Sequence, residues 1–318
     1  SPPWENWPPR WLAASTALDA DRIIVAGTHT HSGPSLLRTN YLKPVDAEYV
    51  ACLQEWMVGV GQRACRAAAP AWLGWGLGRA QIGSNRRCCW AGGTHSMHGD
   101  TTRGDFTGLE GPDDPAHLAL FAVDADGGVL AVLYNNASHP TCFYGADYYS
   151  ADFPGEARRQ LRTALGQIPV LFLNGAFGDL AIEDQLSKHH RSETREQRML
   201  RAAHLVTGET LRLLHRASFS QDVPVRHRGC ELRVDVRLPQ PKRLAWARET
   251  LARVDGGAEV KVWDRLVAYG TCLLQDEYEA DPVDCLRLHA VRLGDVALLT
   301  QPCELFCQFG LDIKRRSP

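Results

Sequence analysis

The fold is decided by residues 129 to 173, where Val129-Leu130-Ala131-Val132-Leu133-Tyr134 is followed by Pro154–Leu165 and then by Val170-Leu171-Phe172-Leu173. The two short apolar runs are typical of buried strands. The segment between them has Pro near its start and Gly166 just past its end, which is typical of a helix. This alternation favours the α/β class, with a mixed β-sheet core flanked by helices.

The same alternation continues on both sides of this stretch. Strands are predicted at 23–26, 232–238, 285–293 and 296–300, and helices at 47–69, 194–216 and 242–254. A hairpin is predicted where Asp124–Gly128 separates two apolar runs within 118–134. Because no segment has the composition of a linker, we expect one domain spanning residues 1–318.

The composition excludes several classes of protein. With 35 basic and 37 acidic side chains, the 318-residue chain has a formal charge of −2. Nucleic acid is therefore not an expected partner, because no basic excess is present to displace counterions. No apolar run approaches the roughly 18–20 residues that a membrane helix needs. No signal peptide is visible, which favours a cytoplasmic over a secreted location.

Ten cysteines are present. They are sparse and form no C-x-x-C motif, so we interpret them as buried free thiols in a reducing compartment rather than as a disulfide framework. Cys88–Cys89 and the pair Cys303 and Cys307 lack the paired spacing of a cysteine zinc site.

Four polar clusters come directly after predicted strands. They are Thr28–Pro34, Asn135–Pro140, Asn174–Asp179 and Gln301–Glu304. In open α/β sheets, ligands bind beyond the carboxyl ends of the strands. The sequence therefore predicts a site at the C-terminal ends of the strands, where His, Asp and Glu side chains collect.

Histidines and a glutamate in these clusters form a candidate set of metal ligands. His29 and His31 share one face if strand geometry continues through them, and Pro140 restricts the backbone of His139 to the extended region. Taken singly, each histidine has an ordinary structural explanation, and Glu304 is explained as a carboxylate at a helix N-terminus. Taken together, two imidazoles and Glu304 match the His₂Glu ligand type of hydrolytic zinc sites, which leave one position open for water.

Several further motifs accompany these clusters in one order along the chain. The set is Ala26-x-Thr-His-Thr-His-Ser-Gly-Pro34, Asn85-Arg86, Gly111-Pro-x-Asp-Pro115, Ala137-x-His-Pro-Thr141, Ser150-Ala-Asp-Phe-Pro-Gly155, Asn174-Gly-x-x-Gly-Asp179 and Pro302-x-Glu304. In these motifs the chain resembles the catalytic domain of the neutral/alkaline (non-lysosomal) ceramidase family, as a divergent or partial member.

The resemblance implies a zinc-dependent hydrolase of amide (C–N) bonds, in which metal-activated water attacks the carbonyl of an N-acyl substrate. It implies that His29, His139 and Glu304 bind Zn²⁺. The substrate class that follows is a small-molecule or lipid N-acyl amide, with no assigned oligomeric state.

The resemblance also implies roles for four residues around the metal. His31 would act as general base and then as acid, exchanging a proton near neutral pH. Arg86 would face the substrate carbonyl and stabilise the oxyanion. Asp152 and Asp179 would support these groups by accepting an imidazole N–H or by orienting Arg86.

The chain also departs from the family pattern. Ala181 stands where ceramide-cleaving members carry a serine. The family's tyrosine ligand downstream of the glutamate is expected to lie beyond Pro318, because the last tyrosine here is Tyr278, so the chain is either a fragment or completes its zinc shell with water. The family's start and its C-terminal immunoglobulin-like domain are expected to be missing. These departures leave the identity of the substrate open.

Two alternatives to a zinc hydrolase stay open. The first is a catalytically weak ceramidase-like homologue that acts as a ligand- or partner-binding protein. The second is a serine hydrolase that uses Ser32 or Ser138 with a nearby histidine, although the G-x-S-x-G motif of such enzymes is absent.

Overall fold

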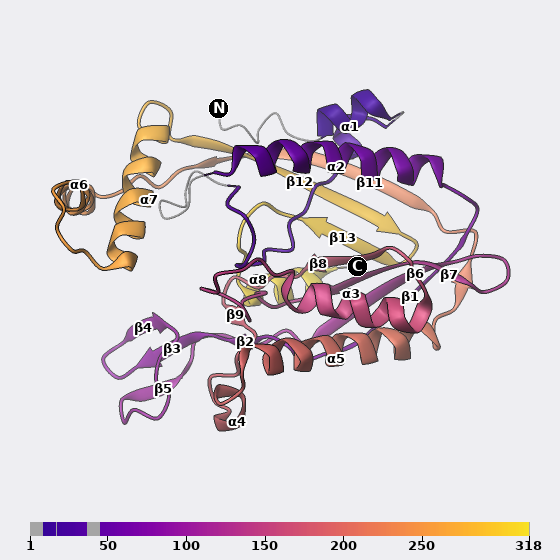
Figure 1. Ribbon diagram of the computed structural model, residues 1–318, viewed down its shortest axis with the longest axis horizontal. Coiled ribbons are helices and arrows are strands. Elements are labelled where there is room, and N and C mark those ends of the chain that lie inside the picture. Colours follow the sequence, from indigo (N-terminus) through magenta and orange to yellow (C-terminus); the bar gives the residue numbers. More distant parts are fainter. Residues whose placement is uncertain (1–8, 17, 37–44, 318) are drawn as a thin grey trace.

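The computed structural model describes residues 9–16, 18–36 and 45–317 (Figure 1). Its main sheet has five strands in the order β10-β1-β6-β7-β8. Their bounds are β10 (Phe219–Ser220), β1 (Trp72–Arg79), β6 (Ala116–Val123), β7 (Val129–Asn136) and β8 (Val170–Asn174). Only β7 and β8 run parallel, and the other neighbouring strands are antiparallel. The predicted α/β class with a mixed sheet is confirmed.

The predicted hairpin and the helix after it are also confirmed. The Asp124 carboxylate accepts the N–H groups of Asp126 and Gly128, which closes the turn between β6 and β7. The helix α3 (Asp152–Leu165) then connects β7 to β8. It ends at Gly166, because the φ of 93° at that residue is incompatible with a right-handed helix. This crossover brings the C-terminal ends of β7 and β8 to the same edge of the sheet.

The core lies between one face of the main sheet and two helices. Helix α5 (Arg195–Leu214) begins with a capping box at Thr194 and packs beside α3 on this face (Figure 1). Phe121 and Tyr134 from the sheet and Leu161 from α3 are fully buried there. Burying side chains of this size stabilises the fold by about 2–3 kcal/mol each.

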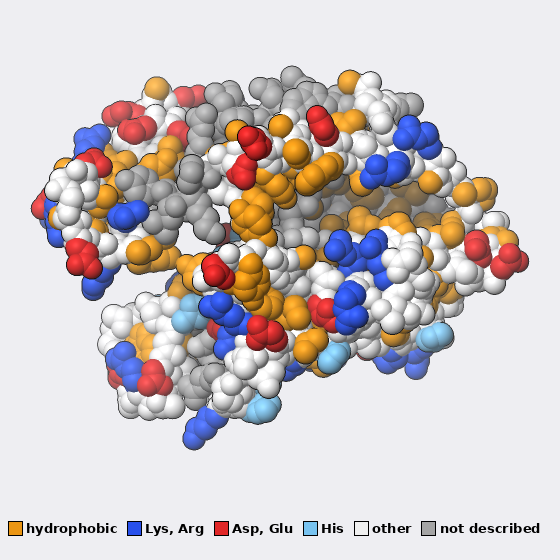
Figure 2. All heavy atoms as spheres, in the orientation of Figure 1, with side chains coloured by type: hydrophobic (Ala, Val, Ile, Leu, Met, Phe, Trp, Pro, Cys, Tyr) orange, Lys and Arg blue, Asp and Glu red, His pale blue; other side chains and the backbone are white. Residues whose placement is uncertain are grey.

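The opposite face of the main sheet is apolar and only partly covered. A second sheet, in the order β11-β12-β13, and helix α2 (Ala47–Arg66) lie on this side (Figure 1). The bounds of its strands are β11 (Val225–Asp235), β12 (Val283–Leu293) and β13 (Val296–Thr300). Trp75 packs closely on Gly294 between the sheets, while Leu77 is 71% exposed. Figure 2 accordingly shows hydrophobic side chains gathered in a hollow between the layers.

Short strands carry the segments that frame the candidate site. A small sheet has the order β4-β3-β5, and β2 pairs with β9. Their bounds are β2 (Ser84–Asn85), β3 (Arg87–Trp90), β4 (Thr94–Met97), β5 (Phe106–Leu109) and β9 (Leu180–Ala181). The remaining helices are α1 (Pro9–Ser15), η1 (Ala20–Arg22), α4 (Lys188–Arg191), α6 (Pro241–Asp255), α7 (Val262–Tyr278) and α8 (Cys307–Arg316). No helix in the described ranges is both long and apolar enough to cross a membrane.

Two predicted strands differ from the structure. Residues 23–26 form no strand, and the residues that follow them join the 140–150 loop, where the His31 N–H donates to the Pro140 carbonyl and the Ser32 carbonyl accepts the Ser150 N–H. The strand predicted at 232–238 is β11, which begins at Val225 and ends at Asp235 because it pairs with β12 along its whole length. The other predicted strands and helices are confirmed within a few residues, and the single-domain organisation stays a prediction.

Candidate metal centre

Three imidazoles converge beyond the C-terminal end of β7. His29, His31 and His139 each offer a ring nitrogen, and these nitrogens lie within 4.8 Å of one another. The prediction that His29 and His31 address one centre agrees with this arrangement, but the strand geometry assumed for them is wrong. The φ of His29 is 63°, so the backbone turns there and the two rings meet with their centroids 4.9 Å apart.

Glu304 joins the histidine cluster from the segment after β13. Its Oε1 lies 3.6 Å from His29 Nε2, and its Oε2 lies 3.3 Å from His139 Nε2. The hydrogen bond with His139 is the main cause that lowers the pKa of Glu304 to about 2. The carboxylate is therefore ionised at neutral pH and faces two imidazole nitrogens.

The local packing holds Glu304 in this position. Gly178 N–H donates to the Leu305 carbonyl at 2.9 Å. A Cβ on Gly178 would overlap the Glu304 carbonyl oxygen and lie 2.9 Å from its carbonyl carbon. The glycine of the Asn174–Asp179 motif is therefore required for the close approach of these two loops.

The orientation of the imidazoles fits a metal ligand set. His139 is 1% exposed, and its Nδ1–H donates to the Leu180 carbonyl at 2.7 Å, which leaves Nε2 as the ring nitrogen that faces the centre. His29 Nε2 is buried and has no hydrogen-bond partner. Ligand atoms around a tetrahedral zinc are about 3.3 Å apart. Two such nitrogens with one carboxylate between them therefore fit Zn²⁺.

His31 differs from the other two histidines in its exposure. Burial and the neighbouring rings of His29 and His139 lower the pKa of His31 to about 4, below the near-neutral value expected from the resemblance. The main physical reason is that the ring loses part of its hydration even though the residue reaches the surface, and the two neighbouring imidazoles further disfavour a positive charge. His31 is therefore neutral at pH 7 and able to accept a proton, and its side chain remains exposed.

Arg86 reaches the same centre from the segment between β2 and β3. Its Nη2 donates to the Gly178 carbonyl at 2.9 Å and lies 3.3 Å from His139 Nε2. Burial lowers the pKa of Arg86, while Glu304 and Asp179 oppose that effect, so the guanidinium stays charged. Its Nε is buried without a hydrogen-bond partner.

Asp179 supports the centre in a way that the sequence did not predict in detail. Its Oδ1 accepts the N–H of Cys307 at 2.7 Å, and its Oδ2 accepts the Asn85 side-chain amide at 2.9 Å. Cys307 is the first residue of α8, whose own capping residue makes no side-chain hydrogen bond. Asp179 therefore caps α8 from another loop, and its carbonyl also accepts the N–H of Arg86 at 2.8 Å.

Asp152 makes different contacts from those expected. Its carboxylate accepts the N–H groups of Phe143 and Phe153, and it also bonds the Cys142 thiol. Neither Arg86 nor an imidazole is among its hydrogen-bond partners, so the expected direct role is wrong. Asp152 instead fixes the loop between His139 and α3, because its carboxylate oxygens accept backbone N–H groups at the two ends of that loop.

The serine alternative finds no matching geometry. Ser32 Oγ is buried without a partner, and Ser138 Oγ points to the carbonyl of His139 rather than to an imidazole nitrogen. Ala181 is 1% exposed within β9, next to Leu180, whose carbonyl accepts the His139 Nδ1–H. All ten cysteines are free, as predicted. The expectation that they are buried is wrong for five of them, which are Cys52, Cys65, Cys230, Cys285 and Cys303.

Three residues of the site were not found from the sequence. Phe177 packs the edges of its ring against His29 and His139, with centroids 5.0 and 4.6 Å away. The exposed Tyr144 lies 5.9 Å from His31, and His98 N–H donates to the Arg86 carbonyl. The nearest indication in the sequence was that Phe177 and Tyr144 follow predicted strands within or just after the polar clusters.

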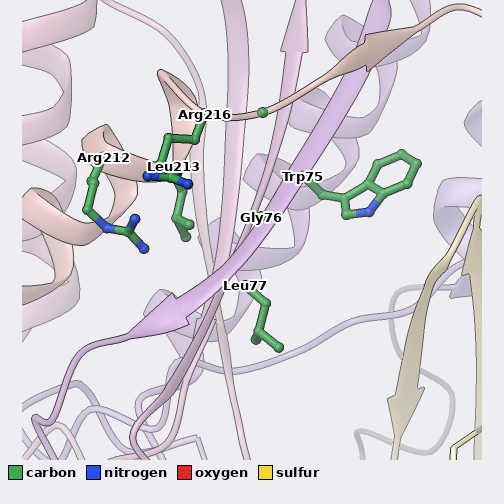
Figure 3. A pocket seen from close by; sticks show the side chains of 7 residues that line it. Trp75, Gly76, Leu77, Arg212, Leu213 and Arg216 are labelled. Atoms are coloured by element: carbon green, nitrogen blue, oxygen red, sulfur yellow. The ribbon is translucent and has the colours of Figure 1, made fainter.

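A second hollow lies away from this centre, between β1 and α5. Figure 3 shows Arg212 and Leu213 of α5 beside Gly76, with Trp75 and Leu77 extending from the same strand. Arg212 is paired with Glu209 at 2.7 Å. The residues that line this hollow include no imidazole, carboxylate or thiol, so it is not the candidate site.

The fold is similar to that of solved ceramidase structures. The crystal structure of neutral ceramidase from Pseudomonas aeruginosa matches with a TM-score of 0.61 and 16% identity, covering 91% of this chain and 50% of that one. A structure of ceramidase complexed with C2 matches with a TM-score of 0.60 and 17% identity, covering 91% and 51%. The chain thus spans about half the length of these proteins. No family model and no curated protein matches the sequence. The resemblance inferred from the motifs is confirmed at the level of the fold.

Proposed function

We propose that this protein is a zinc-dependent hydrolase of amide (C–N) bonds that acts on an N-acyl substrate. The observation that carries the proposal is the convergence of His29, His139 and Glu304 from distant segments, with the buried His29 Nε2 facing Glu304 and making no hydrogen bond to any described residue. The ceramidase-like fold supports the same chemistry.

The residues present fit Zn²⁺, and each has a reason for its part. His29, His139 and Glu304 would hold the ion, which when bound polarises a carbonyl and supplies a nucleophilic water at neutral pH. His31 belongs to the same cluster of nitrogens. We assign His31 to proton transfer because its side chain is exposed, whereas the His29 nitrogen is buried.

Two side chains act on the substrate in this proposal. His31 is neutral at pH 7 and accepts the proton of the attacking water. The Arg86 guanidinium, held by the Gly178 carbonyl, stabilises the negative charge that develops on the acyl oxygen. The His31 imidazolium then donates its proton to the leaving amine, and the products are a carboxylate and an amine.

The substrate is a small-molecule or lipid N-acyl amide. Ala181 stands where ceramide-cleaving family members carry a serine hydroxyl, and this position is not among the proposed metal ligands. The substitution therefore bears on which amide is cleaved rather than on the ligand set. Ceramide, N-acyl amino acids and N-acetylated sugars are the substrates to compare.

Metal content and hydrolysis of this substrate panel test the proposal. We expect purified protein to hold close to one zinc per chain, and Glu304→Gln and His29→Ala to lose it. His204→Ala, at an exposed position of α5, is the matched control and should keep both zinc and activity. A chain that folds, binds no zinc and gains no activity on adding zinc would contradict the proposal and favour a ligand-binding homologue.

A further inference from the structure

His98 lies beside the centre on a segment outside the motifs that identified the site. The register of β3 and β4 pairs Arg87 with Met97. At the next position of the same ladder, His98 N–H donates to the Arg86 carbonyl at 2.7 Å. The charge of Arg86 also acts on the His98 ring, which places the two side chains near one another. His98 is therefore the cross-strand neighbour of Arg86.

The backbone of His98 adopts an unusual conformation. Its φ is 63°, in the left-handed region that residues other than glycine rarely occupy. Among the described residues, the other non-glycine positions with positive φ are His29 and Asp152. Such conformations persist where the surrounding structure enforces them, and they concentrate at ligand sites. Two of these three residues are thus histidines at or next to the proposed centre.

A buried amide orients the His98 ring. Gln185 is 7% exposed, and its Nε2 lies 3.4 Å from His98 Nδ1. The main chain of Gln185 is also held, because its backbone carbonyl accepts the Thr101 hydroxyl at 2.8 Å. Because the amide donates, Nδ1 accepts and the ring proton is placed on Nε2.

The neighbourhood keeps this ring neutral. Although His98 reaches the surface, its ring loses part of its hydration, and this effect, followed by the charge of Arg86, lowers its pKa, while Glu183 opposes the shift. The His98 side chain is exposed, and its Nε2 makes no hydrogen bond within the described residues. His98 therefore presents a neutral N–H donor to solvent beside Arg86.

We propose that His98 is a specificity-determining residue, whose Nε2–H donates to an oxygen that the substrate carries beside its scissile carbonyl, on the Arg86 side. The inference rests on the proposed amide hydrolysis and adds a recognition rule to it. A hydroxyl and a carboxylate both supply such an acceptor oxygen. An N-acyl alkylamine supplies none.

Three octanamides with a common acyl chain test this rule. N-octanoylglycine carries a carboxylate, N-octanoylethanolamine a hydroxyl, and N-octanoylethylamine neither. We expect His98→Phe to lower kcat/KM about 10- to 100-fold for whichever oxygen-bearing amides the natural chain prefers, and to change the ethylamine less than twofold. His98→Gln keeps an N–H donor and should restore part of the preference. An equal loss for all three substrates, or no loss for any, would overturn the proposal.

A measurement without turnover separates this inference from the proposed function. Ring ¹⁵N NMR should show His98 as the Nε2–H form, with its resonance identified by its absence in His98→Gln. Adding N-octanoylglycine or N-octanoylethanolamine to zinc-loaded protein should shift that resonance, and N-octanoylethylamine should not. Zinc binding with no hydrolysis of any amide would remove the proposed function. Identical ¹⁵N responses to the three compounds would remove the role of His98.

Discussion

Replacing Gly178 by alanine tests whether the two loops at the centre must touch. The new Cβ would lie 2.9 Å from the carbonyl carbon of Glu304 and 3.0 Å from a ring carbon of Phe306. Carbon atoms in contact normally lie about 3.5–4.0 Å apart. The backbone carrying Glu304 must therefore move by at least about 0.6 Å. Overpacking of this kind costs about 1–3 kcal/mol, and we expect the upper end because the obstructing atoms are backbone.

Gly208→Ala is the matched control, because it makes the same substitution at a position where a Cβ has space. Gly208 lies within α5, and a Cβ there would meet nothing within 4 Å. Replacing a helical glycine by alanine stabilises by about 0.5–1 kcal/mol. The urea concentration at the midpoint of unfolding should therefore fall for Gly178→Ala and rise for Gly208→Ala.

Zinc affinity gives a second measure of the Gly178 contact. Because Glu304 is displaced, we expect Gly178→Ala to bind zinc about 10- to 100-fold more weakly, with Gly208→Ala unchanged. If Gly178→Ala has the same urea midpoint and the same zinc affinity as the natural chain, the two loops are not held together as described.

Three other predictions follow from buried groups near the core and the centre. Burial lowers the pKa of His117 from 6.5 to about 4, so the unfolded chain binds its proton at higher pH than the folded one does. The resulting stability is complete above about pH 6.5 and falls by on the order of 3 kcal/mol as the pH drops to about 4. The free energy of unfolding, measured in urea at several pH values, should depend less on pH for His117→Phe than for the natural chain, and the exposed His204→Gln should match the natural chain. The same pH dependence for His117→Phe and the natural chain would refute this. Asp179→Asn turns an acceptor of the Cys307 N–H and Asn85 amide into a partial donor, so we expect a loss of about 1–3 kcal/mol by denaturation, and natural stability would count against the capping role. Arg86→Lys should keep its zinc and lower kcat about 100-fold, whereas unchanged kcat would remove the oxyanion role.

Much of the fold could be predicted because most strands and helices carry a regular apolar period. The hairpin of β6 and β7, helix α3 and strand β8 follow from local sequence alone. Strand β1 was missed because its large apolar residues alternate with glycines, which are depleted in strands. In the structure Phe219 of β10 fills the space beside Gly74, and Leu213 of α5 fills the space beside Gly76.

The site was predictable at the level of its motifs but not of its hydrogen bonds. Histidine and carboxylate types after predicted strands indicated a His₂Glu ligand type, and the family resemblance implied that His29, His139 and Glu304 form it. The partners of Asp152 and Asp179 depend on which backbone N–H groups the loops turn toward, and a single sequence does not encode that visibly. His98 was missed because its position depends on the β3–β4 pairing rather than on a motif.

The centre draws its side chains from near both ends of the described chain, and this affects the kinetics of folding. His29 and Glu304 can meet only after the intervening sheets have formed, since contacts so distant in sequence are slow to close. A cation bound between them would therefore make contacts that form late in folding. Its loss to a chelator is then expected to accelerate unfolding far more than it slows refolding, so that metal occupancy sets the lifetime of the native state.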